Sequence, residues 1–463
     1  MKKSLCTLTC IASALLTAST AHADEFFYES GWSLFPEGQS GTVDSTFGGS
    51  LQTHQNLLFV GTDGADGPSV LVYNTNDWTV VRRITPNDAP SHFGSQIETD
   101  GERIWISGTD AVYVFELSTG NQLHKFTEPT GDTLGEYGGS FAIAEDRLYI
   151  GDLAAPVGEI PETEGVVYIY DTTDNTLIDT LVSEGLSSSE DFGTSVQVDG
   201  DLLFVAAPND SYLSSDGPFA VINSGSVLIF DRFTLEQVNI LRTGYEDSSG
   251  GAASFGPSFT VNNGKIIVQH SVPGCQGGSY PKHGSWFIDI SGGSIGNAEN
   301  IYGDCFGTIN FMNMYSKDGI AVLDRRSSDP TQPSYTHGIQ VHDLSGPAPS
   351  ALAQPAIDLE NSTSVSESVG SIKLAFSSRY LFVGLGSASD SEGLGRVVVI
   401  EATCNYAFRK ADINEDNTID VFDVFGFLDL WTAQDTEADL VTDGVWDIFD
   451  VFAYLDYYSE ACR

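Results

Sequence analysis

The sequence predicts an all-β body followed by a small helical domain, on two observations. Seven β-rich units follow one another along the body, and each begins with an aromatic or apolar residue followed by glycine. A shorter repeat, with a period of 27 residues, lies near the C-terminus and combines acidic loops with apolar segments. Units of four short strands at such intervals are typical of a β-propeller. We therefore expect a seven-bladed β-propeller with a small α-helical C-terminal domain.

The heads of the seven units recur 44 to 63 residues apart. They are Phe47-Gly48, Phe93-Gly94, Tyr137-Gly138, Phe192-Gly193, Phe255-Gly256, Phe306-Gly307 and Val369-Gly370. A recurring aromatic residue beside a glycine favours packing between neighbouring blades over a chemical role.

Four strands follow each head. In the fourth unit they are expected after Phe192 as 193–196, 202–206, 225–230 and 237–241. Second strands are expected elsewhere at 57–61, 103–107, 147–151 and 380–384, and third strands at 70–73, 112–115, 166–170 and 397–400. The seventh unit ends after its third strand, whereas a strand at 32–35 has no unit of its own. We expect that strand to complete the last blade and close the ring.

Two segments of the fourth unit, Phe192–Ser195 and Val205–Pro208, resemble the FG-GAP repeats of integrin-type propellers. The resemblance implies adhesion or partner recognition, and members often carry an acidic calcium loop between the first two strands. Here that connection is only Asp199-Gly200-Asp201 or Asp100-Gly101-Glu102, which is too short to enclose a cation. We interpret both as hairpin turns.

Long connections between second and third strands are the expected variable face of the propeller. They carry scattered acids and histidines: Asp152, Glu159, Asp210, Asp216, Asp324, His270, His283 and His337. Paired carboxylates can hydrolyse glycosides, but no pair here has a diagnostic spacing and no set of acid, base and nucleophile is recognisable. The sequence therefore predicts no catalytic residues and no organic cofactor.

The first C-terminal loop spaces its oxygen ligands as an EF-hand does, at positions 1, 3, 5, 7, 9 and 12. These are Asp412, Asn414, Asp416, Thr418 through its carbonyl, Asp420 and Asp423. The second loop offers Asp439, Asp443, Val445 through its carbonyl, Asp447 and Asp450. Val441 occupies position 3 of the second loop, so one ligand is missing and a weaker Ca²⁺ site is expected.

Each loop runs into one apolar segment with helical periodicity, at 421–431 and 448–458. No helix precedes either loop, and position 12 is Asp in both copies. With the pairs Phe427-Leu428 and Tyr454-Leu455, these features resemble a dockerin. The resemblance implies Ca²⁺ binding and docking to a cohesin-type module.

Dockerins bind through the helices after the loops, often near loop positions 10 and 11. These positions hold Val421-Phe422 and Ile448-Phe449. Two interpretations stay open: the pairs face solvent as a docking patch, or they pack the two helices together, since a unit of this size has few core residues. The unit could also be an end cap that packs on the propeller.

The N-terminus has the layout of a secretory signal peptide over residues 1–23, with Lys2-Lys3, an apolar run and the site Ala21-His22-Ala23. We therefore expect a secreted protein with a propeller over 24–402 and a dockerin-like domain over 404–463. No other segment predicts a transmembrane span. A net charge of −44 disfavours nucleic acid as a partner.

Four cysteines remain after the signal peptide. Pairs Cys275–Cys305 and Cys404–Cys462 follow the chain order most simply, although two other connectivities stay open. A bridge between the latter two would enclose the calcium-loop domain.

Two functions compete on these observations. One is a secreted calcium-binding protein that docks to a cohesin-type partner while its propeller binds or displays a polysaccharide or surface ligand. The alternative is a polysaccharide-degrading enzyme, a hydrolase or lyase, tethered by the same module. The lack of a catalytic set favours the non-catalytic function.

Overall fold

The computed structural model describes the strands and helices together with most of their turns. The described residues are 32–34, 46–64, 67–88, 90, 92–130, 137–153, 165–183, 191–213, 220–221, 225–242, 254–272, 282–290, 298–302, 309–317, 320–327, 336–344, 350–353, 372–377, 380–385, 395–401, 411, 413, 421–435, 438–441 and 444–460.

Seven four-stranded antiparallel sheets make up the body. The first four are β2 (Leu51–His54) to β5 (Val80–Ile84) with β3 (Leu57–Gly64) and β4 (Gly67–Asn74) between them; β6 (Ile97–Thr99), β7 (Arg103–Gly108), β8 (Ala111–Glu116) and β9 (Gln122–Thr127); β10 (Ser140–Ala144), β11 (Arg147–Asp152), β12 (Val166–Asp171) and β13 (Leu177–Val182); and β14 (Val196–Asp199), β15 (Leu202–Ala207), β18 (Ser226–Asp231) and β19 (Gln237–Leu241).

The last three sheets follow the same plan. They are β20 (Ser254–Asn262), β21 (Lys265–Val272), β22 (Lys282–Asp289) and β23 (Ala298–Tyr302); β24 (Ile309–Lys317), β25 (Ile320–Ser327), β26 (Thr336–Asp343) and β27 (Ser350–Ala353); and β28 (Ile372–Phe376), β29 (Tyr380–Leu385), β30 (Arg396–Glu401) and β1 (Trp32–Leu34). A two-stranded hairpin, β16 (Tyr212–Leu213) with β17 (Ala220–Val221), is inserted in the fourth sheet.

The strand β1 joins the two ends of the body. Trp32, Ser33 and Leu34 pair antiparallel with Val399, Val398 and Val397 of β30. The side chain of Leu34 is buried in the cluster that also holds Phe47 of the first unit. The expectation that the strand near residue 32 completes the last sheet is therefore confirmed.

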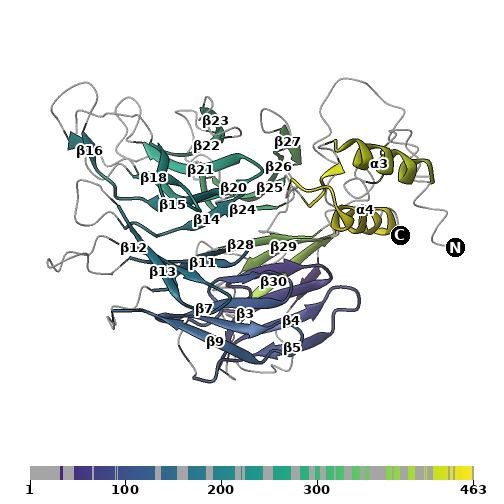
Figure 1. Ribbon diagram of the computed structural model, residues 1–463, viewed down its shortest axis with the longest axis horizontal. Coiled ribbons are helices and arrows are strands. Elements are labelled where there is room, and N and C mark those ends of the chain that lie inside the picture. Colours follow the sequence, from purple (N-terminus) through teal and green to yellow (C-terminus); the bar gives the residue numbers. More distant parts are fainter. Residues whose placement is uncertain are drawn as a thin grey trace.

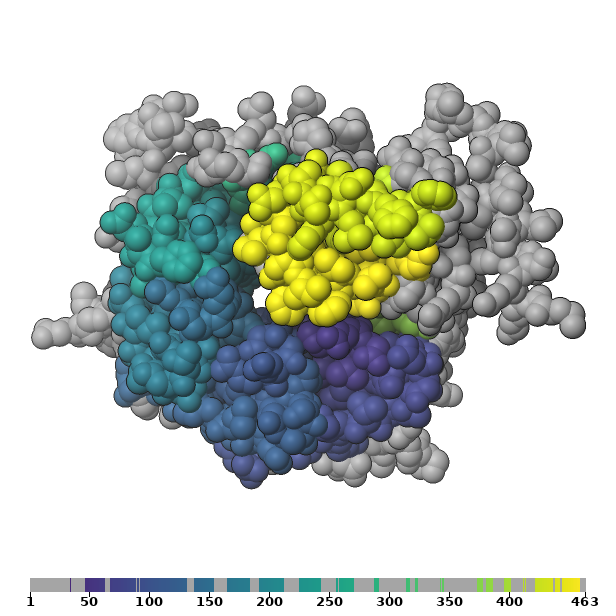
Figure 2. All heavy atoms as spheres, turned by 45° about the vertical axis from the view of Figure 1, so that its right-hand side comes forward, coloured from purple at the N-terminus to yellow at the C-terminus, as the bar shows by residue number. Residues whose placement is uncertain are grey.

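The sheets are arranged around a common centre. The first strands of consecutive sheets contact one another in the order β2, β6, β10, β14, β20, β24 and β28, and β28 contacts β2 again. Figure 1 shows the sheets in this succession, and Figure 2 shows the first four sheets around a central opening. This cyclic order of antiparallel sheets defines a β-propeller.

The heads of the units pack between neighbouring sheets, as expected. Phe192, for example, is fully buried in one cluster with Tyr149 and Val167 of the preceding sheet. Gly193 has a φ of +97°, and its N–H donates to the carbonyl of Ala206. A Cβ atom there would lie 2.9 Å from the carbonyl oxygen of Val166, so only glycine allows this approach.

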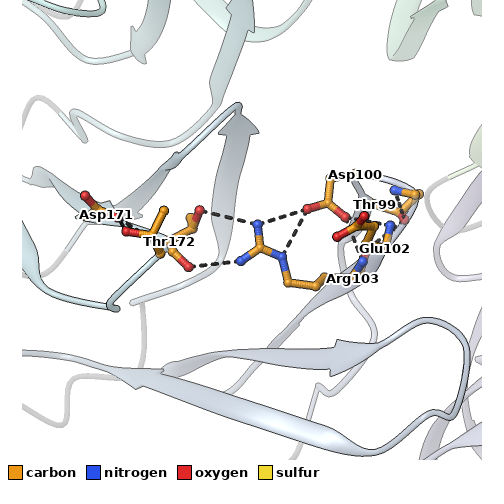
Figure 3. Close-up of polar contacts among 8 residues, drawn as sticks. Thr99, Asp100, Glu102, Arg103, Asp171 and Thr172 are labelled. Carbon is orange, nitrogen blue, oxygen red and sulfur yellow. Dashed lines mark hydrogen bonds and ion pairs between the residues drawn. The ribbon is translucent and has the colours of Figure 1, made fainter. Parts of the chain in front are cut away.

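Arginine side chains add polar bridges between sheets on the edge where strands 3 and 4 turn. Arg103 donates from Nη1 to the carbonyl of Thr172 in the next sheet at 3.0 Å, and it pairs with Asp100 at 3.0 Å (Figure 3). Arg147, at the equivalent position one sheet later, donates to the carbonyl of Arg232. These contacts satisfy turn carbonyls that strand pairing leaves open.

The short turns between first and second strands confirm the hairpin interpretation. Asp199 ends β14, Leu202 begins β15, and the two residues are paired across the turn. Gly200 has a φ of +55° and Gly101 has a φ of +91°, which are the left-handed conformations that tight turns require.

Two helices follow the propeller: α3 (Val421–Ala433) and α4 (Ile448–Glu460). Their hydrophobic cluster contains no residue of the propeller within the described part of the chain. No helix of the described residues is long and apolar enough to cross a bilayer.

Candidate functional site

The C-terminal unit is built around two aromatic side chains that occupy equivalent positions of the repeat. Phe427 of α3 and Tyr454 of α4 lie 27 residues apart in the sequence. Their rings stack with centroids 4.2 Å apart and an interplanar angle of 4°. Both side chains are buried, and Ala438 completes the buried cluster. The two copies therefore meet through the same face of their helices.

Side-chain hydrogen bonds tie each helix to the opposite copy. The indole Nε1 of Trp431 donates to the carbonyl of Asp447 at 3.1 Å, and the hydroxyl of Tyr454 donates to the carbonyl of Ala411 at 3.1 Å. The indole of Trp446 also donates to the carbonyl of Asp435 at 2.7 Å. The second loop and the residue before the first loop are thus hydrogen-bonded to the opposite copy.

The second loop folds with the turn that its spacing predicts. Gly444, at position 6, has a φ of +72°, and its N–H donates to Oδ2 of Asp439 at position 1 with a distance of 2.9 Å. An EF-hand loop needs a sharp turn at this position. The side chain of Asp439 is therefore drawn towards the inside of the loop by the backbone itself.

Asp450, at position 12, closes the loop from the first turn of α4. Its Oδ1 accepts from the N–H of Val441 at 3.1 Å and its Oδ2 accepts from the N–H of Asp447 at 2.9 Å. The carboxylate is fully buried. Asp423, the equivalent residue of the first copy, is also fully buried in the first turn of α3. Negative charge at the start of a helix is favourable to the helix dipole.

Asp447 caps helix α4 as well as holding position 9. Its Oδ1 accepts from the N–H of Phe449 at 2.8 Å, which is the bond of an N-cap residue. One carboxylate oxygen of Asp447 and one of Asp439 are therefore engaged with the backbone. The oxygen donors of this loop suit a hard divalent cation in kind.

The described residues hold only part of the expected ligand set. Asp423, Asp439, Val445, Asp447 and Asp450 are described. The remaining residues lie outside the described part of the chain: Asp412, Asn414, Asp416, Thr418, Asp420 and Asp443. Among the described residues, no three acidic, histidine or cysteine side chains gather closely enough to hold a metal ion. The four cysteines, Cys275, Cys305, Cys404 and Cys462, also lie outside.

The two apolar pairs at loop positions 10 and 11 face solvent. Val421, Phe422, Ile448 and Phe449 are 52% to 64% exposed. Exposure of this degree argues against the interpretation in which these pairs pack the two helices together, and docking through them stays a prediction. The contact between the helices is made instead by Phe427 and Tyr454.

The exposed apolar surface continues along both helices beyond the predicted pairs. Phe425 and Leu428 of α3, with Phe452 and Leu455 of α4, are 36% to 56% exposed. The sequence analysis named Leu428 and Leu455 but not Phe425 and Phe452, although the 27-residue period relates residue 425 to residue 452. We call the eight residues the apolar helix face: Val421, Phe422, Phe425, Leu428, Ile448, Phe449, Phe452 and Leu455. Figure 2 shows the two helices at the surface of the molecule, in front of the propeller.

The long connections of the propeller provide fewer described side chains. Asp152, at the end of β11, and Asp210, after β15, are both buried and belong to different sheets. The carboxylate of Asp210 pairs with Nη2 of Arg242 at 2.9 Å. Glu159 and Asp216 lie outside the described residues. These two described acids do not form an open pair that could flank a glycosidic bond.

Comparison with known proteins supports the propeller fold and identifies no family. No family model matches the sequence, and no curated protein matches it. The WD40 repeats of RRP9 are similar in structure, with a TM-score of 0.50 and 12% identity over 82% of this chain and 99% of that chain. Hydrazine synthase from Kuenenia stuttgartiensis gives a TM-score of 0.46 and 12% identity over 80% of this chain and 99% of that chain.

At such identities the similarity concerns the fold alone. The chain is a β-propeller, similar to WD40 propellers, that carries two helices after its last sheet.

Proposed function

We propose that this chain is a secreted, calcium-binding protein whose C-terminal unit docks to a cohesin-type protein module. The propeller then serves binding or display of a surface or polysaccharide ligand. The apolar helix face carries this proposal, because eight exposed apolar side chains on two short helices are a costly surface to leave in water. Such surfaces commonly serve protein association.

The hydrogen bonds of the second loop support a role for Ca²⁺. Gly444 turns the loop at position 6, and its N–H donates to the carboxylate of Asp439 at position 1. The carboxylate of Asp450 at position 12 accepts from the N–H of Val441. When bound, the ion would be held by the loop carboxylates and would fix the start of the following helix. The first loop has acids at the same positions 1, 5, 9 and 12 and adds Asn414 at position 3, so we propose that it binds Ca²⁺ as well.

We also propose a closed ring of seven blades. The seven four-stranded sheets and the cyclic contacts of their first strands support that number. A dockerin-like character of the C-terminal unit rests on the loop spacing and on the stacked, repeat-related helices.

The test uses the full-length secreted protein. Isothermal calorimetry with Ca²⁺ should detect binding that Asp439→Asn weakens, and surface plasmon resonance should detect calcium-dependent binding to a panel of cohesin modules. The double variant Phe422→Ser/Phe449→Ser should abolish docking and leave the calcium heats unchanged. Leu123→Ser, at an exposed site on β9, is the matched control.

Failure to bind Ca²⁺ would contradict the metal role. Docking that survives the double variant would contradict the role of the helix face. Release of reducing sugars from polysaccharides by the purified protein would favour the enzymatic alternative for the propeller.

A further inference from the structure

We infer that the partner of the apolar helix face is a protein with an apolar surface rimmed by basic side chains, and not a second copy of this chain. The inference rests on the proposed docking function and adds the chemistry of the partner to it. Its basis is the distribution of charge around the exposed apolar residues.

The C-terminal unit is exceptionally one-sided in charge. Residues 404–463 include 14 Asp and Glu residues and only three basic residues, Arg409, Lys410 and Arg463, none of which lies between 411 and 462. Neither α3 nor α4 has a basic residue in its last turn. Two bound calcium ions would neutralise only a minority of these carboxylates. The unit therefore presents a negative potential to whatever approaches it.

Two of the acids lie beside the apolar helix face and are related by the same 27-residue repeat. Asp429 follows Leu428, and Asp456 follows Leu455, at equivalent positions of the two copies. Both are exposed. Each lies one helical turn after an exposed aromatic residue, Phe425 or Phe452, so the acid and the aromatic ring share one side of the helix. The apolar face of each helix thus ends in a carboxylate.

These carboxylates differ in exposure from the acids at loop position 12. Asp423 and Asp450 are fully buried, and Asp450 bonds to the backbone of its loop. Asp429 and Asp456 are exposed on the helices, and burying their carboxylates in an apolar interface would have a desolvation cost. A partner that supplies Lys or Arg at the rim offsets this cost and gains association rate.

A second copy is a poor occupant for the same reason. It would bring an equally acidic surface against this one, within a chain whose net charge is −44. Like charges across an interface oppose association. The remaining alternative is a partner that has an apolar surface but no basic side chains, and the experiment distinguishes the two kinds of partner.

The probes are four synthetic amphipathic helical peptides of equal length, titrated into the calcium-loaded full-length protein. Three share a leucine face and differ in their polar positions, which are Lys, Gln or Glu, and the fourth replaces leucine with serine and keeps Lys. We expect the Leu/Lys peptide to bind most tightly, the Leu/Gln peptide more weakly and the other two least. The affinity of the Leu/Lys peptide should fall with rising salt.

The variant Asp429→Asn/Asp456→Asn should weaken binding of the Leu/Lys peptide about five- to tenfold and flatten its salt dependence, with the Leu/Gln peptide unaffected. Glu102→Gln/Glu236→Gln removes two exposed charges from the propeller and should change neither. Circular dichroism checks that each variant keeps its fold.

Equal affinities for the Lys and Gln peptides, with no effect of the Asp variant, would overturn the basic rim while leaving the docking face intact. Equal affinities for the Leu/Lys and Ser/Lys peptides would also overturn the inference, because charge alone would then attract. Peptide binding that persists in Phe425→Ser/Phe452→Ser would overturn the docking function itself.

Discussion

Single residues fix the contact between neighbouring sheets of the propeller. Gly193 approaches the carbonyl of Val166 with a φ that side chains rarely adopt, and Phe192 fills the space beside it. The sequence signal of the heads, an aromatic residue followed by glycine, therefore reports a close approach of backbones. The heads therefore contribute to the stability of the propeller and not to a chemical reaction.

Gly193→Ala should destabilise the protein by about 2 to 4 kcal/mol, because the new Cβ atom meets a backbone oxygen at a positive φ. Gly200→Ala is the matched control: the φ of Gly200 is also positive, but open space surrounds it, so a loss of about 1 kcal/mol is expected. Urea unfolding followed by tryptophan fluorescence measures both. Equal losses would contradict the role of the close approach.

The imidazole of His342 makes stability depend on pH. It is buried in β26, and burial lowers its pKa to about 4. The unfolded chain binds a proton at this group near pH 6.5 and the folded chain only near pH 4, so the free energy of unfolding falls as the pH drops from about 6.5 to about 4. The loss stays constant at lower pH. The full loss is on the order of 3 kcal/mol.

The free energy of unfolding, measured by urea titration between pH 7.5 and pH 4.5, should therefore fall more steeply for the wild type than for His342→Gln. The comparison uses the slope with pH, so a constant loss from the substitution does not matter. Parallel slopes would show that His342 does not titrate between the two states.

At the scale of elements, α3 and α4 divide their apolar residues between a shared core and an open face. Phe427 stacks on Tyr454, whereas Phe425 of the same helix lies 56% exposed. Phe427→Ala should lower the melting temperature of the C-terminal unit and cost about 3 to 5 kcal/mol, whereas Phe425→Ala should cost less than about 1 kcal/mol. Differential scanning calorimetry of the full chain distinguishes them. A similar cost for both would place Phe425 in the core.

The strands were largely predictable and the helix face was not. Alternating and continuous apolar runs located β7, β11, β12 and β29 within a residue or two, because their burial repeats from sheet to sheet. The helices are apolar on several sides, so periodicity alone did not tell which side would meet the other copy. That depended on tertiary pairing of Phe427 with Tyr454, which a single sequence does not encode locally.

Two features of the second loop were predictable from its spacing, whereas its role as a metal site stays a prediction. Gly444 has the turn that position 6 requires, and Asp450 lies where position 12 must close the loop. The exposed residues Phe425 and Phe452 were missed, although the repeat relates them. Equivalence under an internal repeat was the signal that could have found them.

At the scale of the whole molecule, β1 holds the ring together. It is the only described strand that pairs with β30 on the side opposite β29. Deletion of residues 24–36 should lower the melting temperature by about 10 °C or more, since the last sheet loses a strand and Leu34 leaves its core cluster. Deletion of residues 24–30 is the control and should have little effect. A melting temperature unchanged by the longer deletion would contradict closure by β1.

The pairing of β1 with β30 also imposes an order on folding. Its two strands are separated by more than three hundred residues, so the contact has a high cost in chain entropy and forms late. Each of the first six sheets can assemble from neighbouring strands as the chain emerges, while the last sheet must wait for the final strand of the body. Until β30 has been made, β1 is unpaired and open to wrong partners. A nascent chain of this protein therefore spends most of its synthesis with one unprotected strand at its leading end.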